Sequence, residues 1–288
     1  MNITNPCSSQ TISSINYPLS KEEIAEYHDW WGPCASFRLF LPEVMKDKDS
    51  VIYVDSDVLF LSNVQELWDQ FKNFNNNQVG ALAPRAGWHF KVPSVNQNYI
   101  MTPNGRVTQV NSGVFLMNLT RMREPVFRTN DRISLDDFSW NKDLFFPLYH
   151  KYKSDMFGDQ NLINIIFHFN PHLIYLIECR FNYHHKFCFD KEPERWCRSA
   201  ELSGAAIIHG SAKTFYNNYS PAFRAVNNAF RSYEWEEDID QDLLQVIRKN
   251  LLDPAIDNHE HCGGKAQVFL KGMEKAVQEV KKWEENES

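Results

Sequence analysis

The segment Val-Ile-Tyr-Val-Asp-Ser-Asp-Val-Leu-Phe, at residues 51–60, constrains this chain more than any other part of it. Its apolar beginning predicts a buried strand over residues 51–54, with Asp55 and Asp57 directly after it. Side chains two positions apart on an extended chain point to the same face, so the two carboxylates are expected to converge. Paired carboxylates at the end of a parallel strand suit a hard divalent cation that keeps coordination positions for a substrate phosphate.

An Asp-x-Asp pair is also common in solvated turns, so its interpretation depends on three further segments of the chain. These are residues 110–118 (VNSGVFLMN), 157–164 (FGDQNLIN) and 205–210 (AAIIHG). The first and third read as apolar strands, the first opened by Asn-Ser-Gly and the third ending on His209. The second reads as a polar turn that runs into an apolar helix. Together with the paired aspartates, these segments indicate an enzyme that acts on a nucleotide sugar.

The composition is that of a globular protein rather than a disordered one, because 43% of the 288 residues are hydrophobic and 14% are aromatic. This length allows one large domain or two small ones. The net charge of −7 makes the chain acidic overall, so no nucleic-acid partner is expected. No apolar run approaches the length of a transmembrane helix.

Strand-like and helix-like segments alternate along the chain, which predicts an α/β fold with a largely parallel sheet. Strands are expected at residues 51–54, 79–83, 110–119, 173–177 and 205–208. Helices are expected at residues 34–46, 64–71, 135–152, 158–167, 222–231 and 265–283, and Asn63 is expected to cap the second of them. Residues 87–109 form a long polar connection, which is expected to be a lid or an acceptor-side loop.

In their order along the chain, the four segments resemble glycosyltransferase family 8. The resemblance implies a retaining enzyme of the GT-A fold, a Rossmann-like α/β domain with a mixed, mostly parallel sheet, that uses a UDP-sugar and usually Mn²⁺. Four more segments are similar to the glucoside xylosyltransferases, which move xylose from UDP-xylose onto an O-linked glucose on EGF-like repeats such as those of Notch. These are residues 33–42 (PCASFRLFLP), 117–122 (MNLTRM), 221–226 (PAFRAV) and 261–265 (HCGGK).

The resemblance further implies that residues 1–288 form a single catalytic domain of a type II membrane protein in the Golgi or endoplasmic reticulum lumen. In the family, the strand–helix–strand unit that grips the nucleotide base precedes the helix that contains Arg38. About 30 residues precede that helix here, and one such crossover unit takes roughly 30 or more. The domain is therefore expected to lack its N-terminal βαβ portion, through truncation or through loss of the uridine pocket, and to bind UDP weakly.

By resemblance, Asp55, Asp57 and His209 form a metal site, in which Mn²⁺ bridges the donor diphosphate and assists the departure of UDP. Neutral imidazole is a suitable third ligand beside two carboxylates. Lys213 follows His209 by four residues, a spacing shorter than in the broader family. It is either a cation that contacts the diphosphate or an ordinary surface lysine.

The resemblance implies that Arg38 contacts the donor sugar, because its guanidinium can reach sugar hydroxyls or a nearby carboxylate. The alternative, a helix-surface arginine, is disfavoured by its apolar neighbours in the sequence. The resemblance adds Asn111 and Ser112 as donor-binding residues, with Gly113 permitting close approach of the backbone.

Asp159 and Gln160 are the expected catalytic residues. Asp159 is a nucleophile, a group that positions the sugar, or the N-cap of the following helix, whereas Gln160 can only stabilise or orient. Because the family in general offers no well-placed nucleophile, the acceptor is expected to attack on the leaving-group face through an oxocarbenium-like transition state.

Four residues are candidate acceptor contacts or, equally, core residues, because aromatic faces pack on sugars as well as on one another. They are Trp88, Trp140, Asn182 and Tyr183. The nearby Cys179, Cys188 and Cys197 lie in one polar, aromatic stretch. A zinc cluster is conceivable there, but the spacing is not that of paired Cys-x-x-Cys knuckles. A disulfide between two of the three is favoured if the protein is lumenal.

The leading interpretation is an α-1,3-xylosyltransferase whose partners are a UDP-sugar donor and a protein with O-glucosylated EGF-like repeats. A family 8 transferase of another sugar, or of xylose onto xylose, is the alternative within enzymes. A catalytically inactive protein that keeps the fold for binding is the alternative from another class; the missing nucleotide unit favours it and the complete Asp-Asp-His set opposes it. A Mg²⁺ phosphoesterase would need more acidic ligands than these motifs offer.

Overall fold

The computed structural model describes residues 35–86, 100–101, 107–129, 137–152, 158–188, 197–234 and 238–287. The chain divides into two compact units, each built from separate parts of the sequence. Unit 1 comprises Met1–Tyr53, Phe74–Leu82 and His89–Leu176, and unit 2 comprises Val54–Asn73, Ala83–Trp88 and Ile177–Ser288. Both units therefore depend on contacts between chain segments that are far apart in sequence.

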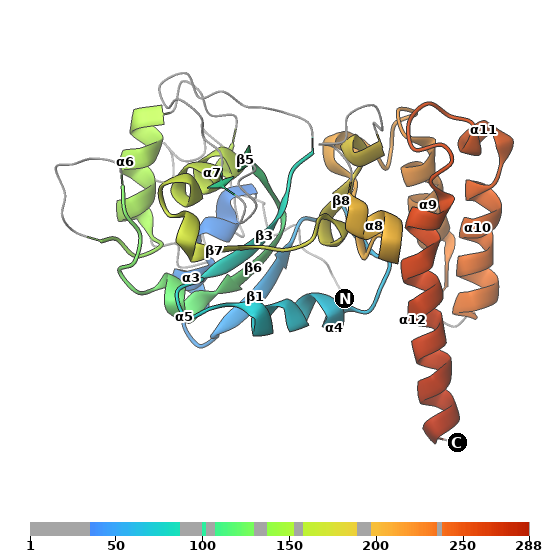
Figure 1. The fold of residues 1–288 in the computed structure, drawn as a ribbon, viewed down its shortest axis with the longest axis horizontal. Helices are drawn as coiled ribbons and strands as arrows, with labels where there is room; N and C mark the ends of the chain where they lie inside the picture. The colour runs from blue at the N-terminus through green and yellow to red at the C-terminus, as the bar shows by residue number, and fades with distance from the viewer. Residues whose placement is uncertain are drawn as a thin grey trace, which may run out of the picture. The chain divides into compact units, whose positions relative to one another are not determined.

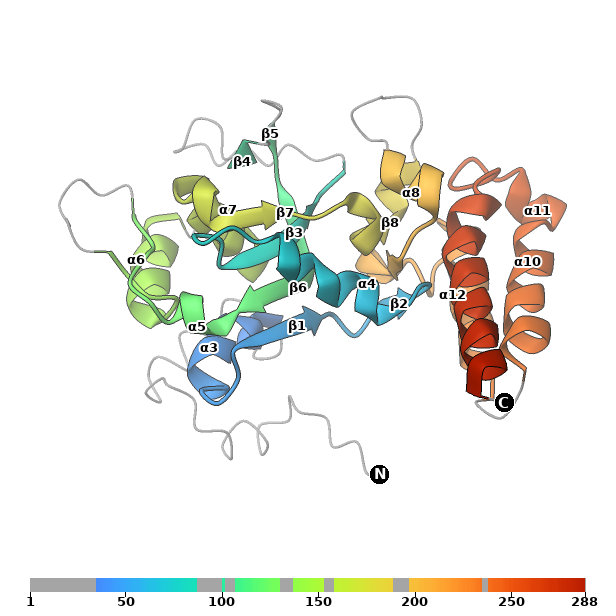
Figure 2. The same ribbon diagram turned by 60° about the horizontal axis from the view of Figure 1, so that its bottom comes forward.

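A four-stranded sheet falls mainly in unit 1. Its strand order is β1 (Ser50–Val54), β6 (Val110–Asn118), β3 (Gly80–Pro84) and β7 (Ile174–Leu176). Figure 2 shows these strands side by side. β3 and β7 are parallel, with Gly80 opposite Ile174. β6 is buried along nearly its whole length, as expected of a strand covered on both faces. A separate antiparallel pair joins β4 (Ile100–Met101) and β5 (Val107–Thr108).

The helices of unit 1 surround an aromatic core. They are η1 (Ala35–Phe40), α3 (Leu41–Val44), α5 (Leu119–Met122), α6 (Lys142–Tyr152), α7 (Asp159–Phe169) and the 3-10 turn η4 (Pro171–Leu173). Trp140 lies in the middle of this core, with the rings of Phe115, Phe127, Phe145 and Phe167 centred 5.3–6.1 Å away. Its indole Nε1 donates a hydrogen bond to the Leu39 carbonyl oxygen at 2.9 Å, which satisfies the polar edge of a buried ring.

A smaller, three-stranded sheet lies in unit 2. Its order is β2 (Val58–Phe60), β9 (Ile207–His209) and β8 (Tyr183–His184). β2 runs antiparallel to β9, with Val58 opposite His209. β8 runs parallel to β9, with His184 opposite His209. The sheet is therefore mixed, and the end of its central strand is flanked by both neighbours.

Helices make up most of the rest of unit 2, and Figure 1 shows α9, α10 and α12 side by side. The helices are α4 (Val64–Trp68), η2 (Asp69–Asn73), η5 (Cys179–Asn182), η6 (His185–Cys188), α8 (Arg198–Ser203), η8 (Ser211–Lys213), α9 (Pro221–Ser232), the π-helix η9 (Ile239–Leu244), α10 (Gln245–Leu251), α11 (Pro254–Asp257) and α12 (Ala266–Glu287). Gly272 allows α12 to approach the sheet closely, because a Cβ there would lie 2.6 Å from the Ala205 carbonyl oxygen.

The predicted α/β class is confirmed, because helices and strands alternate and the two larger sheets each contain a parallel pair. Asn63 caps α4 as predicted, its side chain accepting a hydrogen bond from the Gln65 backbone at 2.9 Å. The helix expected over residues 135–152 begins later, at Lys142. The short strands β2 and β8 were not predicted. In the part of the chain that the structure describes, no helix is both long and apolar enough to cross a bilayer.

Candidate active site

The sheet of unit 2 brings Asp57 and His209 together. Asp57 immediately precedes β2 and His209 ends β9, and these two strands pair antiparallel. The Gly210 backbone N–H donates a hydrogen bond to the Asp57 carbonyl oxygen at 2.7 Å, which extends the ladder past the strand ends. Two segments that are about 150 residues apart in sequence therefore meet because of β pairing.

Asp55 joins them to form a compact group of three possible ligands. One side-chain ligand atom from each of Asp55, Asp57 and His209 lies within 4.8 Å of the other two. His209 Nε2 is 3.3 Å from Asp57 Oδ1 and 3.8 Å from Asp55 Oδ2. Two carboxylates and one imidazole form a donor set that suits Mn²⁺ or a similar divalent cation.

The electrostatics of this group favour an ionised Asp57. When His209 Nε2 carries a proton, its hydrogen bond lowers the pKa of the Asp57 carboxyl below its ordinary value, although partial burial opposes this shift. The two aspartates are half-buried, whereas His209 is only 4% exposed. The site therefore combines two partly exposed carboxylates with a buried imidazole.

Asn182 lies behind the buried imidazole. Its Oδ1 is 2.9 Å from His209 Nδ1, and the residue is 0% exposed. Asn182 was one of four candidate acceptor contacts, but a fully buried side chain presents no surface to an acceptor in this structure. Its observed place is next to the candidate metal ligands.

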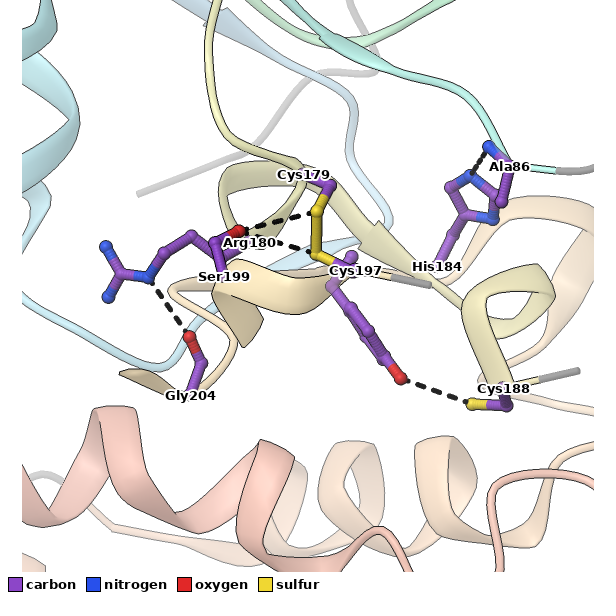
Figure 3. The surroundings of a disulfide bond; sticks show 9 residues. Ala86, Cys179, Arg180, His184, Cys188, Cys197, Ser199 and Gly204 are labelled. Atoms are coloured by element: carbon purple, nitrogen blue, oxygen red, sulfur yellow. Dashed lines mark hydrogen bonds between the residues drawn. A yellow bond between two sulfur atoms is a disulfide. The ribbon is translucent and has the colours of Figure 1, made fainter. Parts of the chain in front are cut away.

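Two disulfides fix the segment that carries Asn182. Cys179 is bonded to Cys197, and Cys188 is bonded to Cys262 (Figure 3 shows the first of them beside the Ser199 hydroxyl). The prediction of a disulfide between two of the three clustered cysteines is confirmed, and the second bond joins the third cysteine to a distant part of the chain. Disulfide sulfurs are not available as zinc thiolates, so these bonds exclude the zinc alternative for the three cysteines.

Two more histidines lie next to the site and are held neutral by burial. Burial lowers the pKa of His185 to about 4 and lowers that of His184 well below its ordinary value. The Thr214 hydroxyl is 3.1 Å from His185 Nδ1, and the Ala86 backbone N–H donates to His184 Nε2 at 3.4 Å. Neither histidine belongs to the group formed by Asp55, Asp57 and His209.

Lys213 lies on the turn that follows β9. Its side chain is exposed and makes no hydrogen bond or ion pair with the residues that the structure describes. Ala212 and Lys213 both have positive φ, at 59° and 62°. Two consecutive left-handed residues without glycine are unusual, and such backbone conformations concentrate at functional sites. The choice between a phosphate contact and a surface lysine stays a prediction.

In unit 1, the structure brings Arg38 and Asp159 into a buried ion pair. The guanidinium of Arg38 donates to both Asp159 oxygens, and its Nη1 donates to the Ser112 carbonyl oxygen at 2.7 Å. Arg38 and Asp159 are both nearly fully buried, which disagrees with a surface arginine. The ring of Tyr53 lies 4.9 Å from the guanidinium carbon, in the range of a cation–π contact.

Gln160 contacts the segment that was predicted to bind the donor. The Ser112 backbone N–H donates to Gln160 Oε1 at 3.1 Å, and the Ser112 hydroxyl oxygen is 3.4 Å from the same atom. Asn111 Oδ1 accepts a hydrogen bond from the Gly113 backbone at 2.9 Å. Residues of three sequence motifs, around Arg38, Ser112 and Asp159, thus form one hydrogen-bonded group.

The position of Asp159 decides one of its three predicted roles. The N-cap of α7 is Gly158, and Asp159 is the first residue inside the helix, so the capping alternative is wrong. A carboxylate that accepts two hydrogen bonds from an arginine is also a weakened nucleophile, because both of its oxygens are engaged. The remaining interpretation, a group that positions the sugar, stays a prediction.

The other acceptor candidates divide as follows. Trp140 is 1% exposed in the core of unit 1, and Tyr183 is 1% exposed in the core of unit 2. The Tyr183 ring stacks on Phe187 and Phe223, with centroid distances of 5.5 and 6.2 Å. These two residues are therefore in core positions, which was the second of the two alternatives. Trp88 lies outside the described residues, as does most of the connection at residues 87–109.

Two residues that support the site were not singled out from the sequence. Tyr53 precedes the paired aspartates and lies under Arg38, and Asn164 ends the DQNLIN motif. The Asn164 amide accepts from the Val110 N–H at 2.8 Å and donates to the Val110 carbonyl at 3.0 Å, tying α7 to β6. Both residues lie inside the sequence motifs described above. The sequence could therefore mark them as candidates, but it could not predict which groups they contact.

Comparison with known proteins places this chain in a family. Residues 2–214 match Glycosyl transferase family 8. The chain is 38% identical over 281 residues to glucoside xylosyltransferase 1 of Danio rerio, a match that covers 94% of this chain and 65% of that protein. It is 37% identical over 278 residues to glucoside xylosyltransferase 1 of Homo sapiens, covering 94% and 60%. The chain thus spans less than two thirds of the length of these relatives.

Solved structures of glycosyltransferases are also similar. The apo form of mouse xyloside xylosyltransferase 1 aligns with a TM-score of 0.45 and 21% identity, covering 66% of this chain and 70% of that chain. The galactosyltransferase LgtC, solved with donor and acceptor sugar analogues, aligns with a TM-score of 0.43 and 22% identity, covering 63% and 60%. The family match covers most of the length of this chain, and the relatives named above are more than 30% identical to it. The chain therefore belongs to glycosyltransferase family 8.

Proposed function

We propose that this chain is the catalytic domain of a retaining UDP-xylosyltransferase, which adds xylose in α-1,3 linkage to an O-linked glucose on EGF-like repeats. The observation that carries the proposal is the convergence of Asp55, Asp57 and His209 next to the strand ends of the unit 2 sheet. The names of the relatives support the choice of xylose and glucose. The family match includes residues of both units, which supports a single domain.

The metal site would be assembled by Asp55 and Asp57 through carboxylate oxygens and by His209 through Nε2. A bound Mn²⁺ supplies Lewis-acid stabilisation of the diphosphate leaving group. The exposed side chain of Lys213 would add a positive charge for the diphosphate.

In unit 1, we assign the donor sugar to the group formed by Arg38, Ser112, Asp159 and Gln160, with Asn111 and Gly113 shaping the adjacent backbone. Asp159 orients Arg38 rather than attacking the sugar, because the arginine occupies both of its oxygens. Gln160 is oriented by the Ser112 backbone and can stabilise charge but cannot carry a sugar. With no free carboxylate in this group, attack by the acceptor hydroxyl on the leaving-group face is the mechanism that agrees best.

The cellular setting follows from the same family. The donor is UDP-xylose, the acceptor is a glycoprotein with O-glucosylated EGF-like repeats, and the parent protein is a membrane-anchored enzyme of the Golgi or endoplasmic reticulum lumen. Two disulfides among the described residues support an oxidising compartment.

The proposal is tested by titrating UDP-xylose into the protein with and without Mn²⁺, and by measuring donor hydrolysis. Asp57→Ala is expected to abolish Mn²⁺-dependent binding of UDP-xylose while leaving the circular dichroism spectrum unchanged, because the Asp57 side chain is about one third exposed. The matched control is Asp69→Ala, which removes an exposed carboxylate of the same unit that pairs with Lys72. Control and unaltered protein should bind alike.

Two results would contradict the proposal. Unchanged donor affinity in Asp57→Ala would remove the metal role from the paired aspartates. UDP-xylose is expected to be turned over faster than UDP-glucose, so equal or faster use of UDP-glucose would assign the chain to a hexosyl branch of the family.

A further inference from the structure

We propose that Asn182 is a positioning residue, which selects the tautomer of His209 that leaves Nε2 free to bind the cation. This inference rests on the proposed metal site and adds a residue whose side chain is shielded from solvent and substrate. It replaces the expectation that Asn182 contacts the acceptor.

The geometry places the two ring nitrogens of His209 in different surroundings. Nε2 faces Asp55 and Asp57, at 3.8 and 3.3 Å, whereas Nδ1 faces Asn182 Oδ1 at 2.9 Å. The ring is therefore held between the carboxylates on one side and one amide on the other. Both His209 and Asn182 are buried, so water does not compete for the contact between them.

The chemistry requires one tautomer of the imidazole. A neutral imidazole carries one proton, and the nitrogen without it is the only one that can bind a cation. A proton on Nε2 would donate to Asp57 and occupy the place of the cation. An amide oxygen that accepts from Nδ1–H holds the proton on the far nitrogen, as hydrogen-bond acceptors behind metal-binding histidines commonly do.

Backbone pairing fixes the position of Asn182 relative to His209. Asn182 ends η5, and the next residue, Tyr183, pairs in parallel with Ile208 of the strand that carries His209. The Ala206 backbone N–H also donates to the Arg180 carbonyl oxygen at 2.8 Å. Asn182 and His209 therefore lie on adjacent segments of one sheet, in a fixed register.

Covalent bonds hold the same segment near both ends. Cys179 is bonded to Cys197 three residues before Asn182, and Cys188 is bonded to Cys262 six residues after it. Between them, the Arg180 guanidinium donates to the Gly204 carbonyl oxygen at 3.1 Å (Figure 3). A supporting residue for a metal ligand needs a rigid scaffold, and this bracketed segment supplies one.

The experiment compares two substitutions of similar volume at this position. Asn182→Leu removes the hydrogen-bond acceptor, and Asn182→Asp keeps an oxygen that can only accept. The affinity for Mn²⁺ alone is measured by calorimetry, and the His209 tautomer is read from imidazole ¹⁵N shifts of the metal-free protein at one pH. Asn227→Leu is the control, because Asn227 is a buried asparagine of the same unit whose Nδ2 has no hydrogen-bond partner among the residues that the structure describes.

Asn182→Leu is expected to lose about 10- to 100-fold in Mn²⁺ affinity and to shift the His209 proton from Nδ1 toward Nε2. Asn182→Asp is expected to recover most of that affinity and to keep the proton on Nδ1, whereas Asn227→Leu should bind as the unaltered protein does. Equal Mn²⁺ affinity in Asn182→Leu and the unaltered protein would overturn this inference alone. Equal loss in the Leu and Asp variants would also overturn it, since volume rather than the acceptor would then matter. Absence of Mn²⁺ binding in the unaltered protein would overturn the proposed function together with this inference.

Discussion

The two units hold their candidate site residues in different ways. In unit 1, Arg38, Ser112, Asp159 and Gln160 are joined by an ion pair and hydrogen bonds above an aromatic core. In unit 2, the candidate ligands lie at the ends of short strands, and the supporting segment is fixed by two disulfides. The described residues of unit 1 contain no cysteine.

The difference reflects how much regular structure each unit has near its site. Unit 1 has the nine-residue strand β6 and the eleven-residue helix α7, whose many backbone hydrogen bonds fix the polar group. The strands of the unit 2 sheet are two or three residues long and cannot supply the same number. In unit 2, the two disulfides supply the rigidity that backbone hydrogen bonds supply in unit 1. The stability of unit 2 should therefore depend on reductant, and that of unit 1 on the ion pair between Arg38 and Asp159.

The largest expected effect is on unit 2. Cys188→Ala with Cys262→Ala removes a bond that spans 74 residues and should lower the free energy of unfolding by about 4 kcal/mol, because the unfolded chain gains entropy. Removing Cys179–Cys197, which spans 18 residues, should cost about 3 kcal/mol. Urea unfolding, followed by hydrogen exchange of peptides from each unit, measures both. A larger loss for the shorter loop would mean that local packing, rather than chain entropy, governs the effect.

The next effect is on unit 1. Arg38→Met leaves the Asp159 carboxylate buried without the guanidinium that pairs with it. The free energy of unfolding should fall by about 3 kcal/mol, near the lower end of the cost of breaking a buried ion pair. The cost is at this end because the carboxyl can become neutral by binding a proton. The same urea measurement applies, with or without reductant. Adding Asp159→Leu should restore part of the lost stability, since no uncompensated charge then remains. If the double variant were less stable than Arg38→Met, Asp159 would have stabilising contacts independent of Arg38.

The smallest effect is a pH dependence that belongs to unit 2. Burial lowers the pKa of His185 to about 4 in the folded protein. Between that pH and the ordinary histidine pKa, His185 is protonated in the unfolded chain but neutral in the folded protein. Stability is therefore lost as pH falls, by about 2 kcal/mol between pH 7 and pH 5. His185→Gln should remove this part of the slope in urea unfolding at the two pH values. An equal slope in His185→Gln and the unaltered protein would exclude the buried histidine as its source.

Much of the regular structure could be predicted from local pattern. The strand before Asp55, the Asn63 cap, the helix after Gly158 and the long C-terminal helix all follow from apolar periodicity and capping residues. The strands β2 and β8 could not be predicted, because two or three residues are too few to show a period. The partner of Cys188 could not be predicted either, because nothing near it in sequence indicates a bond to Cys262.

The sequence by itself determined the family and the residue types of the site, because the motifs with Asp55, Asp159 and His209 are local and their chemistry is specific. Only the tertiary structure decided what each side chain contacts. It placed Trp140 and Tyr183 in cores, paired Asp159 with Arg38 and put Asn182 behind His209. The physical reason is that these side chains are buried by, or hydrogen-bonded to, segments that are distant in sequence. Helix and strand propensity and apolar periodicity depend only on residues that are close in sequence.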